Sequence, residues 1–115
     1  MLLMKNEFFP VIRAGKESAT LRFWRRPMVR VDTIHRIPGL GFVRIDSVRI
    51  VEPASLTEPD ARTDGFATLS ELRRYLRTLY PSLPVSWPGA ANGRKLYQIR
   101  FTYLGQQLAA AADAS

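Results

Sequence analysis

The sequence contains no cysteine and a single histidine, His35. Disulfide bonds and thiolate-bound metals are therefore excluded, as is a zinc site built from several histidines. No apolar run approaches the roughly 20 residues that a membrane-spanning helix needs. The apolar start from Met1 to Met4 is interrupted at once by Lys5, Asn6 and Glu7, so we expect no secretory signal peptide. We predict a cytoplasmic protein without a metal, another cofactor or a membrane partner.

Acidic residues are few relative to basic ones. The 115 residues include 17 Lys and Arg against 10 Asp and Glu, which gives a formal net charge of +7. Arginine accounts for 14 of the 17, and its planar guanidinium binds phosphates and base edges and stacks on rings. This balance favours nucleic acid, a nucleotide or another polyanion as the partner, although a solvated basic surface is the alternative.

The basic residues are concentrated in the segment that follows Thr20. In residues 22–36 five arginines are opposed by one acid, Asp32, and a tryptophan lies among them. Single-stranded nucleic acid is held by phosphate contacts combined with ring stacking. We therefore predict a nucleic-acid-binding or substrate-binding set made of Arg22, Trp24, Arg25, Arg26 and Arg30. Trp87 is a second candidate for stacking.

The length indicates one domain, because two domains of half this size would each bury too little apolar surface. We place the domain at residues 1–105 and a flexible tail at 106–115, and we favour a monomer. Proline and glycine in residues 81–94 indicate a long loop or flap. The apolar spacing predicts a short helix before Gly15 and strands at 18–23, 29–37, 41–51 and 96–104, with a bend near Asp46.

Two further helices are predicted between the third and fourth strands. Thr57 and Thr68 are each followed three residues later by a carboxylate, which is typical of a helix N-terminus. The first helix would end at Gly65, and the second carries leucines on one stripe from Leu69 to Leu79. The class is therefore α+β with a mostly antiparallel sheet.

The strand after Gly15 has a polar face and an apolar face. Ala19, Leu21 and Phe23 would face the core, which leaves Ser18, Thr20 and Arg22 on the other face. The segment from Gly15 to Arg22 resembles the Gly-x-Lys-x-x-Thr-x-Arg signature of the ASCH domain. Later landmarks are similar in order and spacing: Ser47-Val48, Leu56-Thr57-Glu58, Asp64-Gly65-Phe66, Glu71-Leu72 and Tyr97-x-Ile99-x-Phe101.

The resemblance implies a small PUA-like β-barrel with short flanking helices. It also implies that RNA or a modified nucleoside binds in a basic cleft beside the signature strand. The alternative that it implies is an amidohydrolase that deacylates N4-acetylcytidine with a threonine, a lysine and a carboxylate. By position the threonine matches Thr20, the carboxylate Asp64 and the arginine Arg22, whereas the lysine position holds Glu17.

Glu17 leaves the chemistry of this site open. Amide hydrolysis needs an activated nucleophile and a donor or cation for the developing oxyanion, and a carboxylate serves only as a base or an orienting group. Lys16 is the nearest alternative cation, while Glu17 and Asp64 could instead form a carboxylate pair in which one pKa is raised by the other. The candidate catalytic set is therefore Thr20, Lys16, Asp64 and Glu17. Structural roles remain open for Thr20 as a strand residue, Arg22 as an ion-pair partner and Asp64 as a helix-end residue.

Overall fold

The protein is described by a computed structural model that covers residues 4–81, 83 and 93–107. Trp87, most of the expected 81–94 loop and residues 108–115 of the expected tail lie outside this range. The elements in chain order are η1 (Asn6–Phe8), α1 (Phe9–Arg13), β1 (Ala19–Trp24), β2 (Ile34–Ile37), β3 (Gly41–Ile50), η2 (Pro53–Ser55), α2 (Glu58–Thr63), α3 (Leu69–Leu79) and β4 (Lys95–Gly105).

The four described strands form one antiparallel sheet in the order β1-β4-β3-β2. This confirms the α+β class, but the sheet is open, so the closed barrel expected from the sequence is not confirmed. The strand predicted at 29–37 is shorter than expected, since β2 begins only at Ile34. Asp32 has a φ of 64°, a left-handed conformation that interrupts an extended chain.

The long strand β3 bends where its apolar pattern changes phase. Its pairing with β4 shifts register between Ile45 and Ser47, which confirms the bend predicted near Asp46. β4 is central and is buried on both faces over its first half: Leu96 and Gln98 are buried, as are Tyr97 and Ile99.

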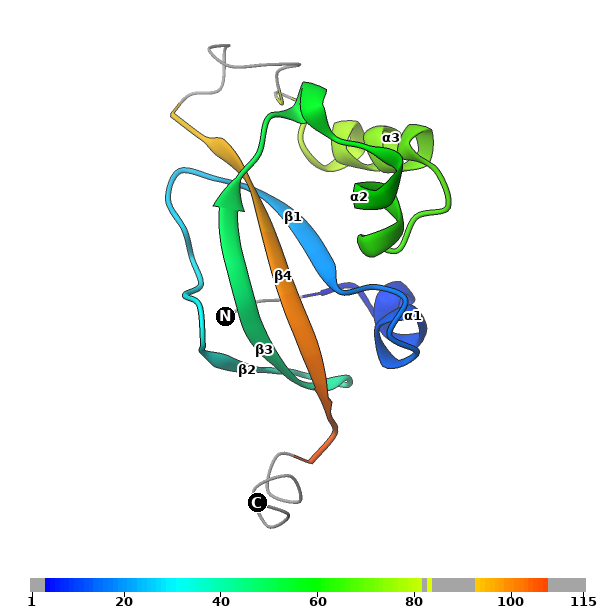
Figure 1. The fold of residues 1–115 in the computed structure, drawn as a ribbon, viewed down its shortest axis with the longest axis vertical. Coiled ribbons are helices and arrows are strands. Elements are labelled where there is room, and N and C mark those ends of the chain that lie inside the picture. The colour runs from blue at the N-terminus through cyan, green and yellow to red at the C-terminus, as the bar shows by residue number, and fades with distance from the viewer. Residues whose placement is uncertain (1–3, 82, 84–92, 108–115) are drawn as a thin grey trace.

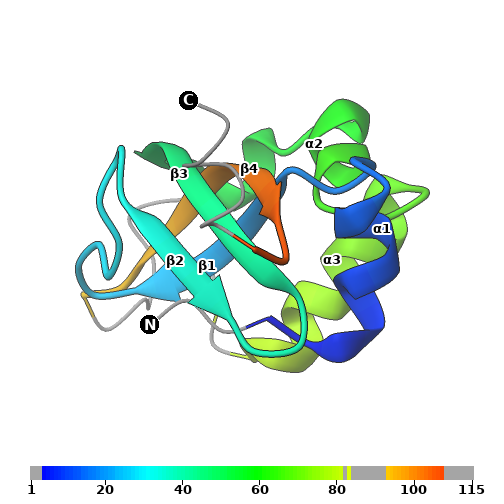
Figure 2. The same ribbon diagram turned by 90° about the horizontal axis from the view of Figure 1, so that it is seen from below.

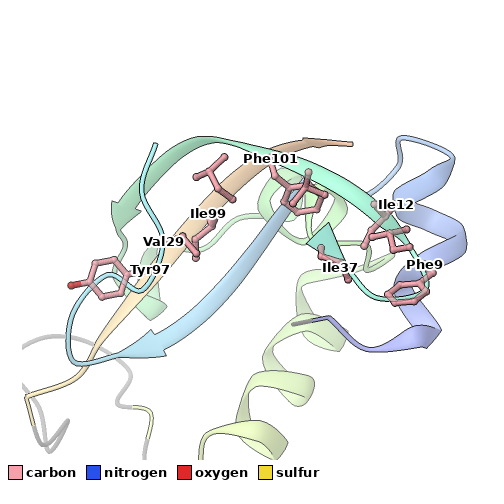
Figure 3. Packing of buried hydrophobic residues seen from close by; sticks show 10 residues of the cluster. Phe9, Ile12, Val29, Ile37, Tyr97, Ile99 and Phe101 are labelled. Atoms are coloured by element: carbon pink, nitrogen blue, oxygen red, sulfur yellow. The ribbon is translucent and has the colours of Figure 1, made fainter. Parts of the chain in front are cut away.

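Each face of the sheet carries its own hydrophobic cluster. One cluster joins α1 to the strands: Phe9 and Ile12 lie near Ile37 at one end of it, and Tyr97 lies near Val29 at the other (Figure 3). The other cluster packs α2 and α3 against β1 and β4, and it consists of Leu21, Phe23, Leu56, Ala61, Leu72, Leu76 and Leu96. The leucine stripe predicted for the second helix is thus the buried face of α3.

The three α-helices gather on one side of the molecule (Figure 1), and the perpendicular view agrees (Figure 2). Hydrogen bonds of the buried Gln98 hold α2 to the sheet. Gln98 on β4 donates from Nε2 to Asp60 Oδ1 at 3.1 Å and accepts at Oε1 from Arg49 Nε at 2.8 Å. Because buried polar groups need partners, these hydrogen bonds favour one placement of α2. The last residues of α2 then reach the start of β1.

Candidate functional site

The turn between α1 and β1 directs Glu17 inward. α1 ends at Arg13, and Gly15, two residues later, has the φ of 74° of the left-handed stop that the sequence predicted. The backbone N–H groups of Lys16 and Glu17 both donate to Val11 O, at 2.9 and 3.1 Å. Glu17 is 5% exposed, whereas Lys16 is exposed to solvent. The local turn therefore places the acid inside the protein and the neighbouring lysine outside.

The end of α2 lies beside this turn. Ser18 N donates to Thr63 O at 2.8 Å, which ties the start of β1 to the last turn of α2. α2 begins with the predicted capping box of Thr57 and Asp60 and ends at Asp64, after which Gly65 has a φ of 88°. A Cβ built on Gly65 would lie 2.8 Å from Glu17 Oε1. Glycine is therefore required here for its conformation and for the space that Glu17 occupies.

These elements enclose a pocket of about 310 Å³ along the outer edge of β1. Its polar lining brings together four of the predicted residues: Glu17, Thr20, Arg22 and Asp64. Glu17, Thr20 and Asp64 are buried, with exposed fractions of 5, 9 and 7%, and Arg22 is half-buried. The polar strand face that the sequence predicted as accessible is thus the wall of a pocket.

The two carboxyl groups of the pocket are far from their usual ionisation. Burial raises the pKa of Glu17 to about 8, and the Arg22 guanidinium offsets part of this effect. Burial, followed by the negative charge of Glu17, raises the pKa of Asp64 well above its usual range, again against Arg22. At neutral pH Glu17 is therefore mostly protonated, and a protonated carboxyl both donates and accepts a hydrogen bond. Both acids of the carboxylate pair that the sequence left as one alternative thus line one pocket, and the charge of Glu17 adds to the raised pKa of Asp64.

One oxygen of the pair lacks a partner. Within the described residues, Glu17 Oε1 is buried without a hydrogen bond. Arg22 Nε donates to Thr20 Oγ1 at 3.3 Å, so the guanidinium and the hydroxyl are held side by side. A buried polar atom without a partner costs stability, and such atoms are concentrated at sites that serve a ligand.

Three aromatic residues form another part of the pocket lining. Phe8, Phe66 and Tyr75 pack on one another with ring centroids 5.2 to 5.7 Å apart, and all three line the pocket. Lys5 also lines the pocket, and its Nζ lies 5.3 Å from the centroid of the Tyr75 ring. Sequence reasoning missed Lys5 because its only local signal was that it interrupts the apolar N-terminus.

The remaining predicted residues lie elsewhere. Trp24 is half-buried against Tyr97, with ring centroids 6.0 Å apart, and packs on the cluster around α1. Arg25, Arg26 and Arg30 are exposed in the segment after β1, and none of them lines the pocket. The structure therefore separates the predicted set into a pocket group and a surface group.

Two other features of the described residues bear on the sequence predictions. In residues 4–81, 83 and 93–107, no three His, Cys, Asp or Glu side chains cluster closely enough to hold a metal ion. In the same part of the chain, no helix has the length and apolar character needed to cross a bilayer.

Comparison by sequence finds no matching protein-family model and no matching curated protein. Comparison of structures finds three related solved chains. The ASCH domain from Lactobacillus crispatus JV V101 aligns with a TM-score of 0.70 at 14% identity, over 88% of this chain and 72% of that one. The hypothetical protein PH0355 gives 0.64 at 15% identity, over 87% and 94% of the two chains. Protein EF3133 from Enterococcus faecalis V583 gives 0.63 at 14% identity, over 90% and 74%.

Proposed function

We propose that this chain, which has the fold of ASCH domains, binds a nucleobase or nucleoside, free or within RNA, in the pocket beside β1. The likeness to an ASCH domain agrees with the signature from Gly15 to Arg22, although a closed barrel is not confirmed. The observation that carries the proposal is that Glu17, Thr20, Arg22 and Asp64 line one pocket together with three packed aromatic rings. A pocket of about 310 Å³ is at the small end of the range for small-molecule sites, roughly 300 to 1,000 Å³.

The chemistry of the pocket suits the edge and the face of a base. A protonated carboxyl offers a donor and an acceptor side by side, which complements an amino group next to a ring nitrogen, as on cytosine or adenine. The ring of Phe66 or Tyr75 offers a surface on which a base stacks. Glu17 Oε1, which has no partner among the described residues, would gain one from such a ligand.

The exposed arginines fit a second role in RNA binding. Arg25, Arg26 and Arg30 lie outside the pocket and are accessible. Contacts from arginine to phosphate position a nucleic acid without reading its sequence, while a pocket that takes one base supplies selectivity. The proposed division is therefore a pocket that selects a base and a basic segment that holds the backbone.

Calorimetric titration with cytidine, N4-acetylcytidine, adenosine and uridine tests this proposal. Thr20→Val keeps the shape of the strand residue and removes its hydroxyl, so it should weaken binding about tenfold if one hydrogen bond is lost. Thr78→Val, on the exposed face of α3 and outside the pocket, is the matched control. No binding of any nucleoside, or equal loss in both variants, would contradict the proposal.

Hydrolysis of N4-acetylcytidine to cytidine and acetate is the second candidate. It is favoured by the presence of Thr20, Asp64 and a lysine in one pocket, although that lysine is Lys5 and the exposed Lys16 lies outside. Thr20 Oγ1 would pass its proton to Asp64 and attack the acetyl carbonyl, with Lys5 as the cation for the oxyanion. Asp64 would return the proton to the leaving N4 amine of cytidine, and water would then hydrolyse the acetyl ester on Thr20 to acetate. Chromatographic detection of cytidine after incubation, lost in Thr20→Val, would support it. An inert wild type that gains turnover in Glu17→Lys would mean that the pocket binds but does not hydrolyse.

A further inference from the structure

Lys5 occupies a distinctive place in the pocket. Of the described residues that line it, Lys5 and Leu79 are the two with exposed side chains, whereas the carboxyls and Thr20 are buried. Lys5 therefore lies at the mouth and the hydrogen-bonding groups lie at the base. The pocket thus has two buried acids with Arg22 at its base and a second cation, Lys5, at its entrance.

The Lys5 ammonium is held in place by an aromatic ring. Its Nζ lies 5.3 Å from the Tyr75 ring centroid, within the range of a cation–π contact. Lys5 also hydrogen-bonds the Tyr75 side chain. Among the described residues the one ion pair joins Arg44 to Asp46 on β3, so no carboxylate of that part of the chain lies within ion-pair distance of Lys5. Lys5 therefore keeps its capacity to bind an anion that comes from outside the protein.

We infer that Lys5 binds a phosphate group of the ligand, so that the pocket takes a nucleotide in preference to a bare nucleoside. This rests on the proposed function, because the base must occupy the inner part of the pocket to bring its phosphate to the mouth. Lysine binds phosphate as a point charge with three donors. Glu17 and Asp64, when protonated, do not repel that phosphate.

The test is the ratio of two affinities measured on the same protein by calorimetry at pH 7 and low salt. Cytidine 5′-monophosphate should bind the wild type about tenfold more tightly than cytidine, as expected for one charge-assisted hydrogen bond. Lys5→Met keeps the aliphatic stem over Tyr75 and removes the charge, so the ratio should fall to about one. Lys16→Met is the matched control, because Lys16 is exposed outside the pocket, and it should keep the ratio of the wild type.

A dinucleotide with an internal phosphodiester distinguishes the two sources of phosphate. If the dinucleotide shows the same dependence on Lys5 as the monophosphate, the natural ligand class includes RNA. If it does not, the ligand is a free nucleotide. Either result supports the inference. The inference would be overturned, and the proposed function would stand, if cytidine and its monophosphate bound equally well to the wild type. The same holds if the ratio of the two affinities changed equally in Lys5→Met and Lys16→Met. Failure of every nucleoside and nucleotide to bind would overturn both.

Discussion

The carboxyl group of Glu17 lies against the backbone of Gly65, so close that a Cβ at Gly65 would stand 2.8 Å from Glu17 Oε1. The two residues come from different ends of the site: Glu17 precedes β1, and Gly65 follows α2. Their contact buries the acid and brings the adjacent Asp64 to the same pocket. Several expected outcomes depend on this contact.

Gly65→Ala should destabilise the protein by about 2 kcal/mol or more. Roughly 1–2 kcal/mol arises from placing an L-residue in a left-handed conformation, and the clash with Glu17 adds to it. In a Glu17→Ala background only the conformational part should remain, since the nearest contact is then removed. Urea unfolding of the wild type, both single variants and the double variant measures the coupling. Additive effects of the two substitutions would show that the contact is not close in solution.

Glu17→Gln should change how stability depends on pH. The folded pKa of Glu17, about 8, is higher than its ordinary 4.5, so the folded state binds the proton more tightly than the unfolded state. The associated stability is fully present below about pH 4.5 and is lost as the pH rises to about 8. Glutamine does not titrate, so Glu17→Gln should not lose this stability. Its free energy of unfolding should exceed that of the wild type by an amount that grows between these two pH values and reaches a few kcal/mol.

Glu71→Gln, an exposed acid of α3, serves as the control for this measurement. Its unfolding free energy should follow that of the wild type from pH 5 to pH 9. Parallel curves for the wild type and Glu17→Gln would mean that Glu17 ionises normally and is accessible to water.

Nucleotide binding should weaken as the pH rises through about 8. Ionisation of Glu17 then removes a donor from the pocket and adds a negative charge that repels the phosphate. The phosphate is almost fully charged above pH 7, so its own titration contributes little between pH 7 and pH 9. Titrations of cytidine 5′-monophosphate at pH 7, 8 and 9 should show a decline in the wild type that is reduced in Glu17→Gln. An identical decline in both proteins would assign the effect to another group.

Arg25→Ala/Arg26→Ala should reduce the salt dependence of RNA binding. If both guanidiniums contact phosphates, the slope of log K against log salt for a single-stranded oligonucleotide should fall by about 1.4. The control is Arg73→Ala/Arg74→Ala, which removes two arginines from α3. This helix lies in residues 56–80, where four arginines are balanced by four acids. No change in the slope, or the same change in the control, would place the RNA backbone elsewhere.

Local patterns were sufficient for most elements of the fold. The alternation of Ala19, Leu21 and Phe23 predicted β1 and its core face, and the pairing of Thr57 with Asp60 predicted the start of α2. The prediction of a strand at 29–37 was wrong over its first half. The apolar residues there fit the alternation of a strand, but Asp32 adopts a left-handed conformation that interrupts it. Closure of the barrel could not be read from such patterns, because it depends on pairing between strands that are distant in the sequence.

The sequence by itself determined the basic character of the protein, its class and the residue types of the signature, because composition, periodicity and capping are local properties. Only the tertiary structure decided which residues share the site. Lys5 and Lys16 are both isolated lysines in the sequence, yet Lys5 lines the pocket and Lys16 is exposed outside it. Burial of Glu17 likewise required the end of α2 to pack against the start of β1. Contacts between segments about 50 residues apart arise from how the elements pack together, and no local pattern records them.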